Sequence, residues 1–472
     1  MQSFIINPRV LVFQQNERSY LFDPSSRSFA YLSNAMLDLI EGRINISSIN
    51  SDEVRFEFFK LHDHMIKHKI IIESNTVNQN SIEPESEFKT VHLLQNLAIF
   101  VTTKCNLKCL YCYAYGGDTE KTITRELWIP AMAYYLNNHN SLSGNGKNQQ
   151  PNVRLIIHGG GEPTVEFEVL RQIVSDFKTM ATGKGLMPTI TIGTNGTYGH
   201  HVQDWIIENK ININISIDGP AEIHNKLRPF RSGENSYDTI INNITTLMKF
   251  GRRVGIRATV TNKTIGSMLN TVKMASNCNI SSVHFEPVYI TGRCSQTAIS
   301  RPDADDFINA FLQSFILGLE LNVDVRYSGL RCFDNPRKRF CGACGQNLCV
   351  TPDGNITTCF EVIQSEDPAA AKFFIGRINI QTNEVEIDQE KLIELWQRDI
   401  GKIMACSNCF MRYQCGGDCP LKCVRSSNGD LNEPDPYRCS ITKGINKQLI
   451  VWLCDGLIKT RNIRGSEIIS FT

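Results

Sequence analysis

The chain has 472 residues, of which 41% are hydrophobic and 21% are charged. This is enough apolar material for roughly three domains of about 150 residues, and it excludes a chain that is mostly disordered. Lysine and arginine number 49 against 48 aspartates and glutamates, so the net charge of +1 provides no broad positive field. We therefore expect neither nucleic acid nor a membrane among the partners of this protein.

The beginning of the chain lacks the basic start, long apolar stretch and small-residue cleavage site of a secretory signal. Its most continuous apolar run, residues 449–454, falls far short of the roughly 20 residues that a membrane-spanning helix needs. We expect a cytoplasmic protein.

The first 75 residues predict a small α+β domain of winged-helix type. We expect two strands at 9–14 and 19–22, helices at 33–40 and 52–68, and a strand or apolar tail at 70–72.

A hairpin with Tyr20-Leu21-Phe22 leads to Leu32-Ser33 and then to the apolar positions Leu37, Leu39 and Ile40. This pattern resembles the peptide-recognition domains of the pyrroloquinoline-quinone chaperone type. The resemblance implies that a precursor peptide adds a strand to the edge of this sheet. The alternative is an ordinary helical cap on the main domain.

A polar linker at residues 76–92 precedes a second domain, which we expect to span 93–325. Its predicted strands lie at 97–102, 153–158, 189–192, 212–217, 255–260 and 282–287. Helical patterns fill the gaps at 125–138, 165–180, 202–209, 237–250 and 265–277. This alternation predicts the α/β class, with a parallel sheet curved into a partial (β/α)6 TIM-like barrel.

Seventeen cysteines are unusual in a long chain without an export signal, and such cysteines indicate metal ligands more readily than disulfides. Cys105, Cys109 and Cys112 follow the first barrel strand, at the edge where barrels build active sites. Three thiolates on one loop can hold three irons of a cubane cluster and leave the fourth iron open. A zinc knuckle is the alternative interpretation.

With Tyr111, the triplet resembles the C-x3-C-x-aromatic-C motif of the radical S-adenosylmethionine (radical SAM) superfamily. The resemblance implies a 4Fe-4S cluster whose open iron binds S-adenosyl-L-methionine. An electron passed to this cofactor breaks a carbon–sulfur bond and yields a 5′-deoxyadenosyl radical.

Further polar segments follow successive strands of the predicted barrel, as in the superfamily. The resemblance implies cofactor binding by Tyr111, Gly160, Gly161, Glu162, Asn195, Ser216 and Arg257. Each segment alone is also explained by a turn or a structural ion pair. We expect His224 and Arg228 to pin a loop rather than to take part in catalysis.

Cysteines crowd the last domain, which we expect to span residues 326–472. Their order resembles the SPASM extension of radical SAM enzymes, which holds two auxiliary 4Fe-4S clusters. The resemblance assigns an outer cluster to Cys406, Cys409, Cys415 and Cys439, and an inner cluster to Cys341, Cys359 and Cys419. The fourth inner ligand stays open between Cys332, Cys344, Cys349, Cys423 and substrate. A structural zinc site is the alternative.

The resemblance implies a maturase that forms a thioether or carbon–carbon crosslink in a ribosomally made precursor peptide, with an external electron donor such as flavodoxin or ferredoxin. In related sulfatase maturases, which form formylglycine, an acid directly follows the cysteine equivalent to Cys359. Phe360 stands there in this chain, and Glu361 is the candidate catalytic acid or base. Sulfatase maturation, a small-molecule radical enzyme and a zinc-stabilised binding protein remain the alternatives.

Overall fold

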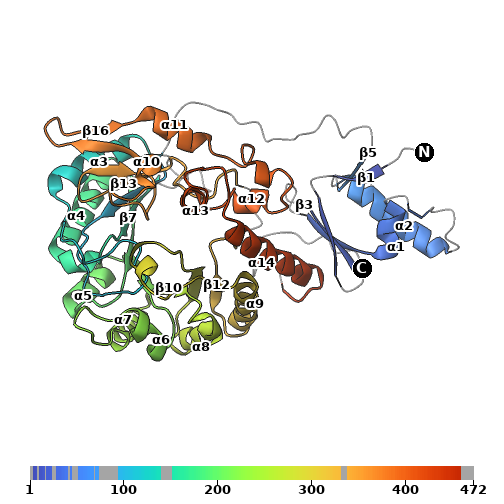
Figure 1. Ribbon diagram of the computed structural model, residues 1–472, viewed down its shortest axis with the longest axis horizontal. Helices are drawn as coiled ribbons and strands as arrows, with labels where there is room; N and C mark the ends of the chain where they lie inside the picture. The colour runs from blue at the N-terminus through green and yellow to red at the C-terminus, as the bar shows by residue number, and fades with distance from the viewer. Residues whose placement is uncertain are drawn as a thin grey trace.

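The structure is a computed structural model that describes residues 4–7, 10–15, 18–23, 28–40, 43–44, 51–67, 70–73, 94–139, 151–330 and 337–458. Figure 1 shows a curved sheet with helices along its outer side, and a smaller N-terminal module at the far end of the molecule.

The N-terminal module contains seven regular elements. They are β1 (Phe4–Ile6), β2 (Leu11–Gln15), β3 (Arg18–Asp23), β4 (Ser28–Ser33), α1 (Asn34–Ile40), α2 (Asp52–Lys67) and β5 (Ile71–Glu73). The two predicted strands of the hairpin and both predicted helices are confirmed. Strands β1 and β4 were not predicted.

The barrel segment alternates strands and helices along the chain. Its strands are β6 (Asn96–Phe100), β7 (Asn152–His158), β8 (Met187–Thr194), β9 (Asn212–Ser216), β10 (Gly255–Val260), β11 (Ser282–Pro287) and β12 (Asp324–Arg326). Its helices are α3 (Arg125–Asn137), α4 (Phe167–Gly183), α5 (His200–Glu208), α6 (Ala221–Leu227), α7 (Tyr237–Lys249), α8 (Met268–Asn277) and α9 (Ala304–Glu320), with short 3-10 turns η3 (Pro163–Glu166), η4 (Ile265–Ser267) and η5 (Gly292–Gln296).

The C-terminal segment has shorter elements. They are β13 (Asn347–Val350), β14 (Asn355–Thr357), α10 (Ala370–Phe373), β15 (Phe374–Asn379), β16 (Glu384–Ile387), α11 (Gln389–Gln397), η6 (Met404–Cys406), α12 (Arg412–Cys415), α13 (Pro420–Ser426) and α14 (Pro436–Cys454).

The six predicted barrel strands are β6 to β11, and they pair in parallel in chain order. The structure adds β12, which has only three residues and is therefore too short for its sequence pattern to predict. The sheet ends at β12 without closing onto β6, so the predicted partial TIM-like barrel is confirmed.

Alternate residues of each barrel strand face the helices or the lumen. On β7, Val153, Leu155 and Ile157 are buried in the core beneath the outer helices, whereas Arg154 between them is exposed. Strand β9 likewise buries Ile213 and Ile215 and leaves Asn214 exposed. The outer face thus forms an apolar core, while the polar side chains of β7 and β9 face the lumen.

Strand β13 extends the barrel sheet on its other side, beside the first barrel strand. It pairs in parallel with β6, and Cys349 lies opposite Ala98. The following segment returns across the lumenal face, where Phe360 and Ile363 pack against Phe100. The cysteine-rich segment is therefore built onto the strand that precedes the cysteine triplet.

A buried ion network joins the barrel to helix α14. Arg438 donates from Nε to Asp418 at 2.9 Å, from Nη1 to Glu286 at 2.7 Å, and from Nη2 to Ser328 at 3.0 Å. Burial acts to raise the pKa of Glu286, but Arg438 and His284 hold it well below its usual range. Glu286 is therefore a carboxylate, which also accepts hydrogen bonds from Ser328 N and Oγ, and the buried Asp418 shares the guanidinium with it.

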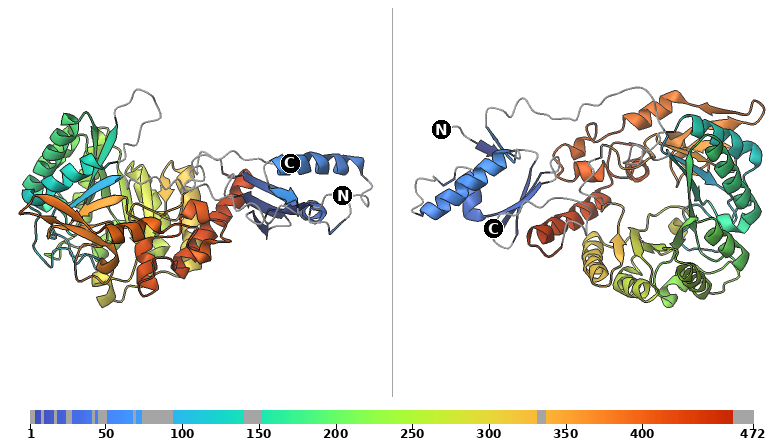
Figure 2. Two further views of the ribbon diagram at one scale, coloured as in Figure 1. Left: turned by 90° about the horizontal axis from the view of Figure 1, so that it is seen from above. Right: turned by 180° about the vertical axis from the view of Figure 1, so that it is seen from behind.

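The three-stranded sheet β2-β3-β4 docks on α14 through one of its faces. Tyr20 and Phe22 of β3 join the main core, and the Tyr20 hydroxyl donates to Asp455 at 3.0 Å. Leu21 points the other way, into the module's own core. Figure 2 shows the module beside α14 and away from the barrel.

No helix in the described ranges has the length and apolarity needed to cross a bilayer. The predicted linker at residues 76–92 lies outside the described residues, and the predicted domain boundaries stay predictions.

We expect the substitution Arg438→Met to destabilise the protein by about 3–5 kcal/mol, because it leaves the buried carboxylate of Asp418 without its ion-pair partner and removes one partner of the half-buried Glu286. Thermal unfolding followed by circular dichroism measures this loss. Arg377→Gln on β15 removes an exposed ion pair and is the control, with an expected change of about 0–1 kcal/mol. Equal melting temperatures for both variants would contradict the role of Arg438.

Candidate functional site

The cysteine triplet lies on the loop after β6, at the carboxyl end of the barrel strands. This loop is bound to the segment after α6 by a hydrogen bond from Lys108 N to Pro229 O at 2.9 Å. From another side, Arg293 Nη1 donates to the carbonyl of Cys109 at 2.8 Å. The loop is therefore held by two distant segments.

The thiols of the triplet lie within electrostatic reach of one another. Burial raises the pKa of Cys105 to about 12, and the charges of Cys109, Glu162 and Cys112 add to this shift. Burial also raises the pKa of Cys109 to about 11, against the opposing effect of Arg228. Cys105 and Cys109 are therefore protonated at neutral pH, so a bound cluster has to displace their protons. Three soft sulfur donors on one loop fit an iron–sulfur cluster.

A glycine segment after β7 lies directly against the triplet loop. Gly161 N donates to Thr102 O at 2.9 Å, and Glu162 N donates to Lys104 O at 2.7 Å. A Cβ atom on Gly161 would lie 1.9 Å from the carbonyl oxygen of Lys104. Only glycine permits this approach, and it places the main chain of Gly160 and Gly161 beside the triplet loop.

The carboxylate of Glu162 is buried and already accepts four hydrogen bonds. They come from Thr164 N (3.1 Å), Thr164 Oγ1 (2.7 Å), Thr194 Oγ1 (2.7 Å) and Asn195 N (2.6 Å). Three of these bonds fall on Oε1, so Oε2 retains capacity to accept another. Glu162 thus organises the ends of β7 and β8.

Tyr111 is fixed by Asp218 and Arg228. The buried Tyr111 hydroxyl donates to Asp218, which also accepts Arg228 Nε at 3.0 Å. The Arg228 guanidinium lies 5.1 Å from the centre of the Tyr111 ring, and its Nη1 is 4.0 Å from Cys109 Sγ. One buried ion pair therefore supports both the aromatic residue and one cysteine of the motif.

His224 pins the same loop. Its Nδ1 accepts the main-chain N–H of Asp218 at 3.3 Å, and its Nε2 lies 3.1 Å from Ser236 Oγ. Burial lowers the pKa of His224 to about 4, so the ring is neutral. These contacts give His224 a structural position in the loop.

The remaining predicted cofactor residues border the lumen. Asn195 Nδ2 donates to Asn106 Oδ1 at 2.8 Å and lies 4.0 Å from Cys105 Sγ. Ser216 and Arg257 stand opposite each other in the pairing of β9 with β10. Arg257 is exposed to the lumen, where a carboxylate can reach it.

The structure also brings together residues that the sequence analysis did not select. The Tyr113 hydroxyl donates to the carbonyl of Phe360 at 3.4 Å, and His158 stacks on the Phe360 ring with centroids 5.5 Å apart. Burial and Arg257 lower the pKa of His158 to about 4, so this imidazole is neutral. No local pattern could have found this group, because its members lie up to 247 positions apart.

The four cysteines of the predicted outer set interact electrostatically. Burial raises the pKa of Cys415 to about 12, and Cys406 and Cys409 add to the shift after Asp418. Burial likewise raises the pKa of Cys439 to about 12, with contributions from Cys415 and Cys406. Helix α14 therefore brings Cys439 to a set that is otherwise contiguous in sequence.

The predicted inner set also comes together. Burial raises the pKa of Cys419 to about 12, and Cys341 contributes next. Cys359 has its pKa raised by burial and by Glu361, Cys419 and Cys341. Among the candidates for a fourth ligand, Cys344 and Cys423 both interact with Cys419, while Cys349 interacts with Cys341. Cys332 lies outside the described residues.

Within the ranges that the structure describes, no three Cys, His, Asp or Glu side chains converge as they would around one metal ion. The fit to clusters rests on the donors themselves, which are two sets of buried and half-buried thiols that interact within each set.

Glu361, the candidate catalytic group, lies in an ion pair. Its carboxylate is 2.5 Å from Lys422 Nζ and 3.9 Å from Arg425 Nη1. Burial acts to raise its pKa, but both cations lower it below the usual value. Glu361 is therefore a carboxylate, which can accept a proton but is poorly suited to donate one.

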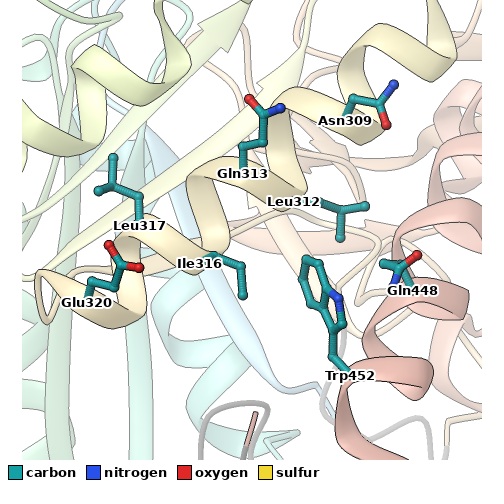
Figure 3. A pocket seen from close by; sticks show the side chains of 8 residues that line it. All are labelled: Asn309, Leu312, Gln313, Ile316, Leu317, Glu320, Gln448 and Trp452. Atoms are coloured by element: carbon teal, nitrogen blue, oxygen red, sulfur yellow. The ribbon is translucent and has the colours of Figure 1, made fainter. Parts of the chain in front are cut away.

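A hollow of about 500 Å³ between α9 and α14 carries different chemistry. Eight described residues line it, chiefly amide and aliphatic side chains with Glu320 and Trp452 (Figure 3). None of these eight is a cysteine or a predicted site residue, so the hollow is separate from the candidate site.

Residues 99–275 match the family model described as the radical SAM superfamily. The chain is 24% identical over 336 residues to a cysteine-type anaerobic sulfatase-maturating enzyme of Clostridium novyi, which covers 67% of this chain and 85% of that protein. It is 28% identical over 194 residues to an uncharacterised protein of Methanocaldococcus jannaschii. That match covers 41% of this chain but only 62% of the relative's length.

The solved structure of native anSMEcpe with bound AdoMet has a similar fold. It superimposes with a TM-score of 0.59 at 18% identity and covers 77% of this chain and 100% of that chain. At this identity the likeness concerns the fold.

We expect the triple substitution Cys105→Ala, Cys109→Ala and Cys112→Ala to remove one of three clusters. Iron in the anaerobically reconstituted protein then falls from about twelve to about eight atoms per chain. Iron and acid-labile sulfide analysis measures the change. Protein that holds zinc without sulfide would contradict the assignment.

We expect Gly161→Ala to weaken binding of S-adenosyl-L-methionine by at least about tenfold, or about 1.4 kcal/mol, because the new methyl collides with the carbonyl of Lys104. Equilibrium dialysis with the reconstituted protein measures the affinity. Gly266→Ala is the matched control, since its Cβ would meet no atom within 4 Å. Unchanged affinity in Gly161→Ala would show that this close approach is not needed.

Proposed function

Because this chain is a member of the radical SAM superfamily with a cysteine-rich C-terminal domain, we propose that it matures a ribosomally made precursor peptide. The proposed product carries a thioether or carbon–carbon crosslink. It forms after a hydrogen atom is removed from the Cα or a side-chain carbon of one precursor residue.

The observation that carries this proposal is the contact between the two cysteine-bearing loops in one lumen. Tyr113 directly follows Cys112, and Phe360 directly follows Cys359, and these neighbours share a hydrogen bond of 3.4 Å. A substrate residue in this lumen therefore lies near the triplet and near the inner cysteine set. Such an arrangement suits hydrogen removal at one site and electron transfer to the other.

When bound, the triplet's cluster and S-adenosyl-L-methionine supply the 5′-deoxyadenosyl radical, while auxiliary clusters on the inner and outer sets accept the surplus electron. Arg257 is proposed to bind the cofactor carboxylate, and Ser216 beside it a ribose hydroxyl. Oε2 of Glu162 and the main chain of Gly160 and Gly161 are proposed to receive the ammonium group.

The groups around Phe360 then face the substrate. The neutral His158 and the anionic Glu361 are both able to accept a proton, and Glu361 keeps its place through Lys422. We propose Glu361 as the acceptor, with its ion pair as the means of orientation. An external electron donor such as flavodoxin or ferredoxin, and a cytoplasmic location, complete the proposal.

The N-terminal module is proposed to bind the leader of the precursor. In its three-stranded sheet, β2 and β4 each have one strand neighbour, so both edges suit the addition of a strand. Because β3 packs on α14, a leader held at this sheet is tied to the domain that carries the auxiliary cysteines.

Sulfatase maturation is the second candidate, and the similarity to the Clostridium novyi enzyme favours it. The residue after Cys359 argues against it, because Phe360 cannot accept a proton. The N-terminal module argues against a small-molecule radical enzyme, because a small substrate does not need a peptide-binding domain.

We expect Cys105→Ala to abolish 5′-deoxyadenosine formation, whereas Cys419→Ala retains it and loses the modified peptide. The first substitution removes the radical source, and the second removes only an auxiliary ligand. The assay combines anaerobic protein, S-adenosyl-L-methionine, dithionite and the peptide encoded by a short open reading frame beside the gene. Mass spectrometry should show loss of two hydrogens for a crosslink.

Cys278→Ala is the matched control, because this half-buried cysteine lies outside every motif. Wild-type protein that forms no 5′-deoxyadenosine would overturn the enzyme proposal. A mass change on a sulfatase peptide, with none on the neighbouring peptide, would favour the second candidate.

A further inference from the structure

Arg398, directly after α11, is among the largest fully buried side chains of the described chain and is 2% exposed. Burial of a guanidinium costs several kcal/mol unless charge and hydrogen bonds compensate it. The surroundings of this side chain therefore need to supply both.

The hydrogen bonds of Arg398 go to carbonyls and to a thiol. Nε donates to Leu431 O and Nη2 to Gly417 O, both at 2.5 Å, and Nη2 also lies 3.3 Å from Cys423 Sγ. Nη1 is buried and has no hydrogen-bond partner in the described part of the chain. Over the same ranges, no carboxylate lies within ion-pair distance of Arg398.

The ionisable groups that interact with Arg398 are cysteines. Cys344 and Cys423, two candidates for the fourth inner ligand, and Cys419 of the inner set lie within its electrostatic reach. So does Cys406 of the outer set. Thiols thus take the place that carboxylates occupy around Arg438.

We propose that Arg398 is a positioning residue that sets the electron affinity of the auxiliary clusters, with Nη1 donating to a cluster sulfur and its charge balancing the cluster. This inference rests on the proposed cluster function of the two cysteine sets. An iron–sulfur cluster with thiolate ligands is negatively charged, and hydrogen bonds to its sulfurs raise its reduction potential. Arg398 offers such a cluster both a buried positive charge and a hydrogen-bond donor, Nη1, that has no other partner in the described part of the chain.

A purely structural role is the competing explanation. In that case Arg398 only joins the carbonyls of Gly417 and Leu431, and its charge is incidental. The two explanations differ in one measurable quantity, the reduction potential, because a clamp between two carbonyls does not alter how readily a cluster takes an electron.

The experiment uses the full-length chain with the triplet substituted by alanine, so that only auxiliary clusters titrate. After anaerobic reconstitution, midpoint potentials are measured by redox titration monitored by electron paramagnetic resonance. In this background, Arg398→Gln should lower the equilibrium constant for reduction of at least one cluster about tenfold, which is about 59 mV for one electron. Arg398→Lys keeps the charge and should lie closer to the parent protein.

Arg377→Gln serves as the matched control, because this arginine of the same domain is exposed and paired with Glu386. Potentials in Arg398→Gln that equal those of the parent, at full iron content, would overturn the inference and leave the proposed function intact. If Arg398→Gln holds no iron, Arg398→Lys decides: retained iron with a potential near the parent value supports the role, and equal loss overturns it. A triplet-free parent without iron–sulfur clusters would overturn both proposals.

Discussion

The parallel pairing of β13 with β6 is the interaction on which the rest of the site depends. It places Cys349 opposite Ala98 and starts the segment that crosses the lumenal face of the first barrel strand. Without this pairing, the loop after Cys359 would have no fixed relation to the loop after Cys112. The two cysteine-bearing regions would then be separate domains rather than two sides of one lumen.

Buried guanidinium groups accompany each cysteine region, although the whole chain has a net charge of only +1. Arg228 lies beside Cys109 and is balanced by Asp218, while Arg438 lies beside Cys439 in sequence and is balanced by Asp418 and Glu286. Arg398 has thiols in place of carboxylates. Positive charge is thus concentrated locally, beside the cysteines that would hold negatively charged clusters. The net charge of the whole chain does not reveal this concentration.

Local patterns were sufficient to predict the barrel strands and the spacing of the cysteines. The strands β6 to β11 have five to eight residues each, and their apolar patterns are visible in the sequence. The spacing of the cysteine triplet depends on only eight consecutive positions. The missed strands β1, β12, β13, β14 and β16 have only three or four residues, so their patterns are too short to separate from loops. Strands β4 and β15, with six residues each, were missed as well. The position of Gly161 was predicted, but the collision that requires glycine there involves Lys104, a distant residue.

The sequence by itself determined the class of the fold, the triplet with its adjoining aromatic residue, and the two expected sets of C-terminal cysteines. Tertiary structure alone decided which side chains meet: Tyr113 with Phe360, Glu361 with Lys422, and Arg398 with the thiols of two sets. The physical reason is that spacing along a loop is a covalent property of the chain. Burial and proximity instead arise from packing between segments that are not adjacent in the chain, from 25 positions apart for Arg398 and Cys423 to 247 for Tyr113 and Phe360. The sequence does not distinguish a buried arginine from an exposed one.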